Sequence, residues 1–309
     1  MSDISIIVPV LNEQDNILEL VDALKKVLEP LLPDYEIIFV DDASSDHSLR
    51  IIKELALENT KIKFISFSRN FGQQAAITAG LDFAQGKAII TMDADLQDPP
   101  QLIPEMIKAW KAGSEIVLMR REHRNDGFFK RITASAYYYL LNKFSEYKLK
   151  DNVGEFRLID KKVADELRNL KEKTRYLRGM IIWLGYSLTY LNYDRPNRKN
   201  GKTGFSLLKM IRLGMNGILN FSLLPLRLAL VVGVLVIILG FLFLGYITLD
   251  IFLNDVLYPL YKLLSVITFI FTGFLFVLIW IIGEYIGKIY NEVKNRPIYL
   301  IREKGNFEI

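Results

Sequence analysis

Hydrophobic and polar positions follow two alternating periods between residue 4 and about residue 119. Short apolar runs predict buried strands at 4–10, 35–40, 62–67, 88–92 and 115–119. Stretches with apolar residues at helical spacing predict a helix capped by Asn12 and further helices at 45–58, 73–84 and 99–112. Strands that alternate with helices predict βαβ units and a largely parallel sheet, so the fold class is α/β.

Polar residues gather where these predicted strands end. The clusters are residues 9–13, Asp41 with Asp42, residues 68–72, and Asp93 with Asp95. The carboxyl ends of parallel strands meet at one edge of a sheet, where open α/β sheets bind their ligands. The first of these turns has no glycine, which argues against the G-x-G-x-x-G turn of an NAD or FAD site. The convergence favours a nucleotide site of another kind.

The stretch at residues 92–100 carries the most specific chemistry. Asp93 and Asp95 follow an apolar strand, and hard carboxylate oxygens in that position suit Mg²⁺ or Mn²⁺ and, through the metal, a diphosphate. Asp98 is expected to cap the helix that follows, because Pro99 and Pro100 then occupy its first positions.

The carboxyl-terminal part of the chain is strongly apolar. Residues 228–249 and 263–283 contain no charged residue. At about 1.5 Å per residue, each is long enough to cross a hydrocarbon core of roughly 30 Å as a helix. The short connection between them carries acidic residues, whereas basic residues flank their other ends. The positive-inside rule therefore predicts that both termini face the cytoplasm.

A further helix is expected between the catalytic part and the first span. Lys209, Arg212, Asn216 and Asn220 form a narrow polar stripe on an otherwise apolar stretch, which is typical of a helix lying in the bilayer interface. The expected organisation is a cytoplasmic catalytic domain at 1–204, this amphipathic helix at 205–223, a membrane part at 224–290 and a cytoplasmic tail at 291–309. Within the membrane part, the two spans are expected at about 226–250 and 262–286.

Composition narrows the chemistry. The chain has two histidines and no cysteine, so a zinc site or a histidine-dependent nucleophile has almost no ligands or bases to use. The absence of cysteine fits a reducing compartment without proving it. The net charge is +4 and 51% of residues are hydrophobic. Much of the basic excess lies near the predicted spans, so we expect anionic lipid as a partner and no nucleic acid.

Several of these stretches together resemble a known family. Residues 5–13, 40–46, 68–72 and 93–100 resemble family-2 glycosyltransferases of the GT-A fold. Residues 176–179, 193–198 and 283–290 extend the resemblance over nearly the whole chain, and the last of these is specific to the membrane-anchored branch. That branch is the polyprenyl-phosphate glycosyltransferases, which include dolichol-phosphate mannose synthases and bacterial O-antigen-modifying glucosyltransferases.

The resemblance implies that a nucleotide-sugar donor passes its sugar to a membrane polyprenyl phosphate with inversion. A UDP-hexose is the favoured donor, with UDP-glucose first, and undecaprenyl phosphate of the inner membrane is the acceptor. The residues implied to bind the nucleotide are Pro9, Leu11, Glu13, Asp41, Asp42 and Asp93. Asp93, Asp95 and Gln97 are implied to hold the metal, and Asp95 is also placed among the catalytic residues. Asp41 has an equal alternative as the cap of the following helix.

The acceptor phosphate is anionic, so it needs cations that hold it beside a like-charged donor. Arginine suits this role through bidentate contacts to phosphate oxygens. The candidates are Arg120, Arg131, Arg157, Arg195, Arg198 and Lys202. A solvated or lipid-facing arginine is the alternative for any one of them.

One position departs from the family pattern. The family commonly has Gly-Asp-Phe-Arg-Leu, with its aspartate at the reaction centre, where this chain has Glu155. The extra methylene moves the carboxylate, and a misplacement of about 1 Å can cost roughly 10²-fold in rate. Glu155 is placed in the catalytic site, and three roles stay open: a working variant, a ligand on the acceptor side, or a mark of reduced activity.

Two other functions stay in view. A catalytically impaired, membrane-tethered nucleotide-sugar-binding protein would fit Glu155. A processive polysaccharide synthase would carry a Gln-x-x-Arg-Trp signature and more spans, and the sequence has neither. The oligomeric state also stays open, with a homo-oligomer among the expectations because paired spans in this branch often associate.

Overall fold

The computed structural model describes residues 2–122, 153–173, 175–194 and 260–307, together with isolated helical positions between 235 and 253. Two compact units result: Met1–Leu207 with Pro297–Ile309, and Leu208–Arg296. The predicted interfacial helix at 205–223 and most of the first predicted span lie outside the described residues. Each unit is treated by itself below.

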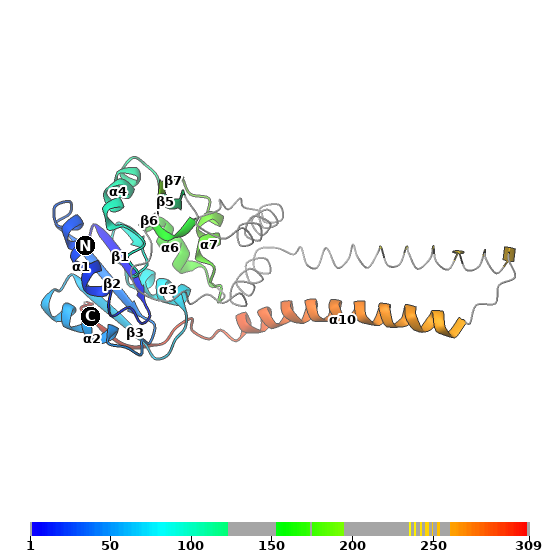
Figure 1. The fold of residues 1–309 in the computed structure, drawn as a ribbon. Helices are drawn as coiled ribbons and strands as arrows, with labels where there is room; N and C mark the ends of the chain where they lie inside the picture. The colour runs from blue at the N-terminus through cyan, green and yellow to red at the C-terminus, as the bar shows by residue number, and fades with distance from the viewer. Residues whose placement is uncertain are drawn as a thin grey trace. The chain divides into compact units, whose positions relative to one another are not determined.

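The first unit is built on one sheet, most strands of which are labelled in Figure 1. Its strands are β1 (Ile4–Val10), β2 (Tyr35–Asp41), β3 (Ile62–Phe67), β4 (Ala88–Thr91), β5 (Ile116–Arg121), β6 (Val153–Asp160), β7 (Leu188–Tyr193) and β8 (Ile301–Gly305). Over the described residues their order is β7-β5-β6-β4-β1-β2-β3-β8. Only β6 and β8 run antiparallel to their neighbours among these pairings. The predicted α/β class and the largely parallel sheet are confirmed.

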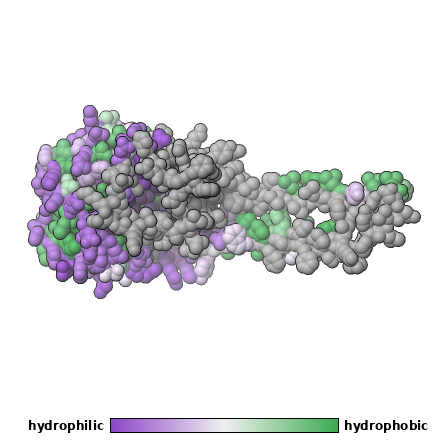
Figure 2. Space-filling view, in the orientation of Figure 1, coloured by the Kyte–Doolittle hydropathy of each residue, from purple (hydrophilic) through white to green (hydrophobic). Residues whose placement is uncertain are grey.

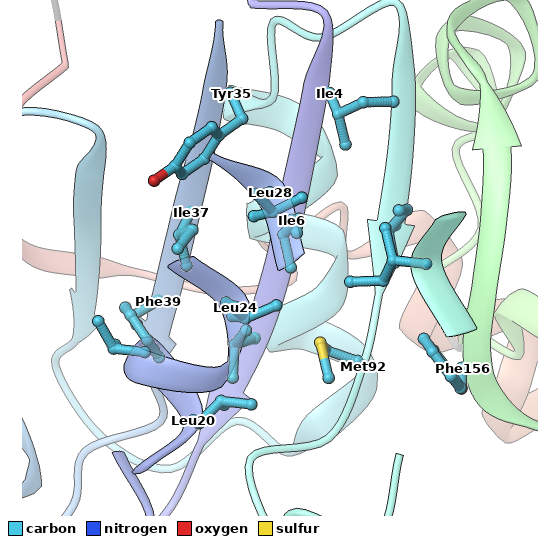
Figure 3. Packing of buried hydrophobic residues seen from close by; sticks show 14 of the residues in the cluster. Ile4, Ile6, Leu20, Leu24, Leu28, Tyr35, Ile37, Phe39, Met92 and Phe156 are labelled. Carbon is cyan, nitrogen blue, oxygen red and sulfur yellow. The ribbon is translucent and has the colours of Figure 1, made fainter. Parts of the chain in front are cut away.

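Helices pack on both faces of this sheet. They are α1 (Ile17–Leu28), α2 (Ser48–Glu58), α3 (Gln73–Phe83), a 3₁₀ turn at Pro100–Leu102, α4 (Ile103–Lys111), α6 (Lys161–Asn169) and α7 (Leu177–Trp183). On one face, Leu24 of α1 packs in a cluster with Ile6 of β1 (Figure 3). On the other face, α3 approaches so closely that a Cβ at Gly80 would lie 2.3 Å from Ile7. Alternation along β1 therefore serves two helical layers.

Two predicted helix starts are wrong. Helix α1 begins at Ile17 rather than directly after Asn12, and α2 begins at Ser48 rather than at residue 45. Asn12 has φ +56°, and its Oδ1 accepts a hydrogen bond from the backbone N of Ser45 at 2.8 Å. The asparagine thus ties the first strand-end loop to the second instead of capping a helix, a long-range contact that local spacing does not reveal.

The segment predicted as a cytoplasmic tail contains a strand of the first unit. Strand β8 pairs antiparallel with β3. Just before it, the ring of Tyr299 stacks on Phe67 with centroids 5.2 Å apart, and its hydroxyl donates to Asp82 Oδ2 at 2.7 Å. The sequence analysis predicted no strand here. The strand pairs with the edge of the sheet and thus satisfies its open hydrogen-bonding groups.

The second unit contains α10 (Leu260–Val293), which includes the second predicted span. Its described side chains include many exposed apolar ones, among them Leu264, Phe271, Trp280 and Ile286, and Figure 2 shows the hydrophobic colouring of the described residues of this unit. Among the described residues, no helix is both long enough and apolar enough to cross a membrane.

Candidate active site

Asp42 joins the end of β2 to the start of α3. Its carboxylate is 3% exposed and accepts hydrogen bonds from the backbone N of Phe71 at 2.6 Å and of Gly72 at 2.9 Å. Burial raises the pKa of Asp42 above its ordinary value, and these two hydrogen bonds offset only part of the rise. Gly72 has φ +95°, a conformation that favours glycine. The carboxylate of Asp42 therefore fixes the end of the loop at 68–72, where α3 begins.

Asp41 has a different role from its neighbour. Its Oδ2 accepts a hydrogen bond from Ser66 Oγ at 2.9 Å, and its Oδ1 accepts one from the backbone N of Ser44 at 3.1 Å. The residue is 1% exposed, and α2 has no side-chain cap. Capping of the following helix, one alternative for Asp41, is therefore wrong. The residue fixes the turn that presents Asp42.

The first strand-end loop lies beside this turn. Leu11 is 44% exposed, and the backbone N of Glu13 donates to Ser48 Oγ at 2.9 Å. The Glu13 side chain accepts a hydrogen bond from Asn16 Nδ2 at 2.6 Å. Pro9 is half-buried at the end of β1. These predicted nucleotide residues share the sheet edge that carries Asp42, because β1 and β2 are paired in parallel register.

The turn after β4 holds the three predicted metal ligands, Asp93, Asp95 and Gln97. Asp93 Oδ1 accepts a hydrogen bond from Gln73 Nε2 at 2.7 Å, which ties it to the first residue of α3. Asp95 is 4% exposed, and its Oδ1 accepts one from the backbone N of Gln97 at 3.2 Å. Leu96, between Asp95 and Gln97, has φ +58°. The turn is thus tight and internally hydrogen-bonded.

Asp98 does not cap the next helix, so that prediction is wrong. Its side chain is fully buried, its Oδ2 accepts the backbone N of Asp93 at 3.1 Å, and its Oδ1 accepts the Tyr193 hydroxyl at 3.0 Å. The 3₁₀ turn that follows has no side-chain cap. Burial and then the charge of Asp98 raise the pKa of Tyr193 to about 12. The buried carboxylate of Asp98 therefore stabilises the turn at residues 93–97, the metal turn.

Glu155 lies in a charged cluster on the face of β6 opposite Phe156. Its carboxylate pairs with Arg157 Nη2, lies 3.8 Å from Arg178 Nη2, and accepts a hydrogen bond from Gln74 Nε2 at 3.3 Å. Burial by itself would raise the pKa of Glu155, but the two arginines and these hydrogen bonds outweigh it and lower the pKa. The glutamate is held ionised.

The predicted acceptor-binding cations are only partly placed. Arg157 belongs to the cluster with Glu155, and Arg120 ends its side chain half-exposed near the end of β5. Arg131, Arg195, Arg198 and Lys202 lie outside the described residues. The sequence analysis missed Gln74, Arg178 and Tyr193 as individual site residues. For Arg178 and Tyr193 the available signal was their position inside two of the family-like stretches.

The oxygen donors of the metal turn fit a divalent cation. In nucleotide sites Mg²⁺ is held by one or two carboxylates plus substrate phosphates, and Asp93 with Asp95 supplies such a pair. Within the described ranges, no group of three or more acidic or histidine side chains is arranged to hold a metal ion.

Several known proteins are similar to this chain over nearly its whole length. A family model described as glycosyl transferase family 2 matches residues 5–168. The uncharacterized glycosyltransferase YkcC of Bacillus subtilis is 43% identical over 98% of this chain and 94% of its own length. The prophage-derived bactoprenol glucosyl transferase of Shigella flexneri is 39% identical over 98% of this chain and 99% of its own.

Proposed function

The chain belongs to glycosyl transferase family 2, and from this premise we propose that it transfers glucose from UDP-glucose to undecaprenyl phosphate. The observation that carries the proposal is the full-length, 39% identity to a protein named for glucosyl transfer to bactoprenol, which is undecaprenol. The strand-end site supports it, because the residues expected to bind nucleotide and phosphate lie along one edge of the sheet. The activity is proposed to depend on Mg²⁺ or Mn²⁺.

The acceptor implies a membrane location. Residues 228–249 and 263–283 carry no charge, and the exposed side chains of α10 are largely apolar. We propose two spans in the inner membrane, with the catalytic domain and both termini in the cytoplasm. The polar stripe of the segment before the first span supports an interfacial helix that keeps the active site at the membrane surface, where a polyprenyl phosphate carries its head group.

The residues of the site divide the work between donor and acceptor. Pro9, Leu11, Glu13 and Asp42 are proposed to hold the nucleoside, with Asp41 fixing the turn behind Asp42. Asp93, Asp95 and Gln97 would hold the cation. When bound, that cation stabilises the negative charge that develops on the leaving diphosphate.

Transfer itself forms one bond and breaks one. An oxygen of the acceptor phosphate attacks the anomeric carbon of the sugar, and the bond from that carbon to the diphosphate breaks, with inversion. The acceptor oxygen is already anionic near neutral pH, so the step releases UDP without requiring a base to remove a proton. Arginines that hold the acceptor against the donor therefore matter more than a general base.

The test uses the purified full chain with undecaprenyl phosphate, Mg²⁺ or Mn²⁺, and a panel of UDP- and GDP-sugars. We expect one lipid-linked sugar per acceptor, fastest with UDP-glucose. Binding of nucleotide sugar without product from any donor would favour the catalytically impaired binding protein instead. Chains longer than one sugar would favour a processive synthase.

A further inference from the structure

Two arginine side chains converge on the carboxylate of Glu155. Arg157 and Arg178 both face the single carboxylate of Glu155, at positions where their side chains are 1% and 17% exposed. Two guanidinium groups therefore meet one carboxylate at a poorly solvated place, where each buried polar atom needs a hydrogen-bond partner.

One polar atom of the cluster lacks a partner. Among the described residues, Nη1 of Arg157 is buried and makes no hydrogen bond. Arg157 lies on β6 between β4 and β5, where the strand on each side fixes its backbone. Burial lowers the pKa of Arg157, and the charge of Glu155 offsets this only in part. An oxyanion would supply the acceptor that this nitrogen lacks.

The cluster adjoins the metal turn. Gln73 donates to Asp93, and the next residue, Gln74, donates to Glu155. Thr91, two residues before Asp93, pairs with Arg157 in the sheet, and its hydroxyl donates to the backbone carbonyl of Glu155. The first turn of α3 thus contacts both groups of charges and fixes them as neighbours.

We propose that Arg157 and Arg178 form the receptor for the acceptor's phosphate monoester, with Glu155 as the counter-ion that orients both guanidinium groups. This rests on the proposed function. The carboxylates of the metal turn repel a bare phosphate and serve the donor through a cation, so a second anionic substrate needs cations of its own. The side chains of Glu155 and Arg178 are 15% and 17% exposed and so reach the surface, whereas Arg157, at 1%, lies beneath them.

Arg178→Gln is the informative variant, because Arg157 is buried and its replacement risks misfolding. Losing charge-assisted hydrogen bonds should raise the KM for undecaprenyl phosphate by about 10- to 100-fold and change the KM for the UDP-sugar by less than about twofold. Arg178→Lys keeps the charge without the planar fork, so its acceptor KM should fall between those of Arg178→Gln and the parent. Arg50→Gln on α2, whose side chain is 68% exposed, is the matched control and should leave both constants unchanged.

Two results would overturn the assignment. A rise in the donor KM alone would place the donor diphosphate at the arginines, and constants equal to those of Arg50→Gln would leave the cluster a structural ion pair. Direct binding separates this inference from the proposed function. Should the parent protein make no product, farnesyl phosphate and UDP with Mn²⁺ still test it by calorimetry. Loss of farnesyl phosphate binding in Arg178→Gln, with UDP binding intact, supports the receptor; equal binding of farnesyl phosphate by both proteins rejects it.

Discussion

Two buried glutamates occupy opposite edges of the same sheet, and their partners differ. Glu36, near the start of β2, accepts hydrogen bonds from Ser5 Oγ and from the backbone N of Gln85, the latter at 2.8 Å. Lys63 Nζ lies 2.7 Å from its Oε2. One cation balances one carboxylate, and the backbone hydrogen bond ties the loop after α3 to the sheet. The contacts of Glu36 therefore stabilise the amino-terminal edge of the sheet.

Glu155 lies toward the carboxyl edge of β4 and faces two arginines. Its partners come from β6, α3 and α7, and one guanidinium nitrogen of Arg157 is left without a hydrogen bond within the described part of the chain. The comparison shows that burial of a carboxylate does not by itself mark a functional site. The partners differ instead: one lysine faces Glu36, whereas two arginines face Glu155 at the edge that also carries Asp42, Asp93 and Asp95.

Asp95→Asn should produce the largest change and affect activity alone. The substitution keeps the size of the side chain and removes a charge that a divalent cation needs. We expect kcat for lipid-linked sugar to fall by about 10³-fold, since the cation supplies several kcal/mol of charge stabilisation. The thermal unfolding temperature should stay near that of the parent. Asp22→Asn, an exposed position on α1, is the control, and full activity in Asp95→Asn would reject the metal assignment.

Glu36→Gln should have the opposite result, with stability lost and activity kept. Removing the charge leaves Lys63, whose side chain is only 12% exposed, without its anion. We expect the free energy of unfolding of the catalytic unit to fall by about 2–3 kcal/mol. Glu54→Gln, at an exposed ion pair, should change it by no more than about 0.5 kcal/mol. A fall in kcat of the folded variant would contradict the division between the two edges.

The regular part of the fold could be predicted from the sequence because it rests on local patterns. Most positions of the first five strands are buried and apolar, as in parallel strands that are covered on both faces. Helix starts failed where a polar side chain bonds a distant segment: Asn12 contacts Ser45, and Asp98 contacts Tyr193. Strand β8 failed for a related reason, because its residues alternate weakly and only the open edge of β3 gives them a partner.

The strand-end residues of the candidate site could be predicted from the sequence, whereas the contacts between residues far apart in the chain could not. The sequence indicated Asp42, Asp93 and Asp95, because each follows an apolar strand. Arg178 stands far along the chain from Glu155, and no spacing rule places α7 beside β6. Long-range packing of this kind depends on the whole fold, which a local pattern does not encode.

Glu155→Asp tests whether the long side chain serves the arginines or the reaction centre. As a counter-ion, the shorter side chain draws away from Arg157 and Arg178, so we expect kcat/KM for the acceptor to fall by roughly tenfold. The family pattern has aspartate here, and a rise in kcat would instead mean that the extra methylene limits the chemistry. Steady-state kinetics against undecaprenyl phosphate at saturating donor distinguish the two results.

Acidification should affect the donor side before the acceptor side. Burial raises the pKa of Asp42, whereas the arginines lower the pKa of Glu155. As the pH falls, Asp42 therefore gains its proton first and loses its capacity to accept from the nucleoside. Donor affinity should weaken by up to about tenfold per pH unit below that raised pKa. Calorimetric titration with UDP should show this limb in the parent and not in Asp42→Asn; an acceptor-side loss at higher pH would contradict the order.

Tyr193→Phe is the mildest change. It tests Asp98, which is buried like Glu36 but stabilises the metal turn at the carboxyl edge of the sheet. The variant keeps the ring, whose centroid lies 6.0 Å from that of Phe156 in an edge-on contact. It removes the hydroxyl, which donates to Asp98 at 3.0 Å and accepts a longer hydrogen bond from Arg121 Nε at 3.3 Å. One hydrogen bond of this kind contributes about 1 kcal/mol, so the Mn²⁺ concentration for half-maximal activity should rise about three- to fivefold. Tyr186→Phe, in the loop before β7, is the control and should leave that concentration unchanged. With a pKa of about 12, Tyr193 stays protonated across the working range, so the effect should not vary with pH. A pH-dependent fall in kcat would mean that the hydroxyl takes part in the reaction rather than in holding the turn.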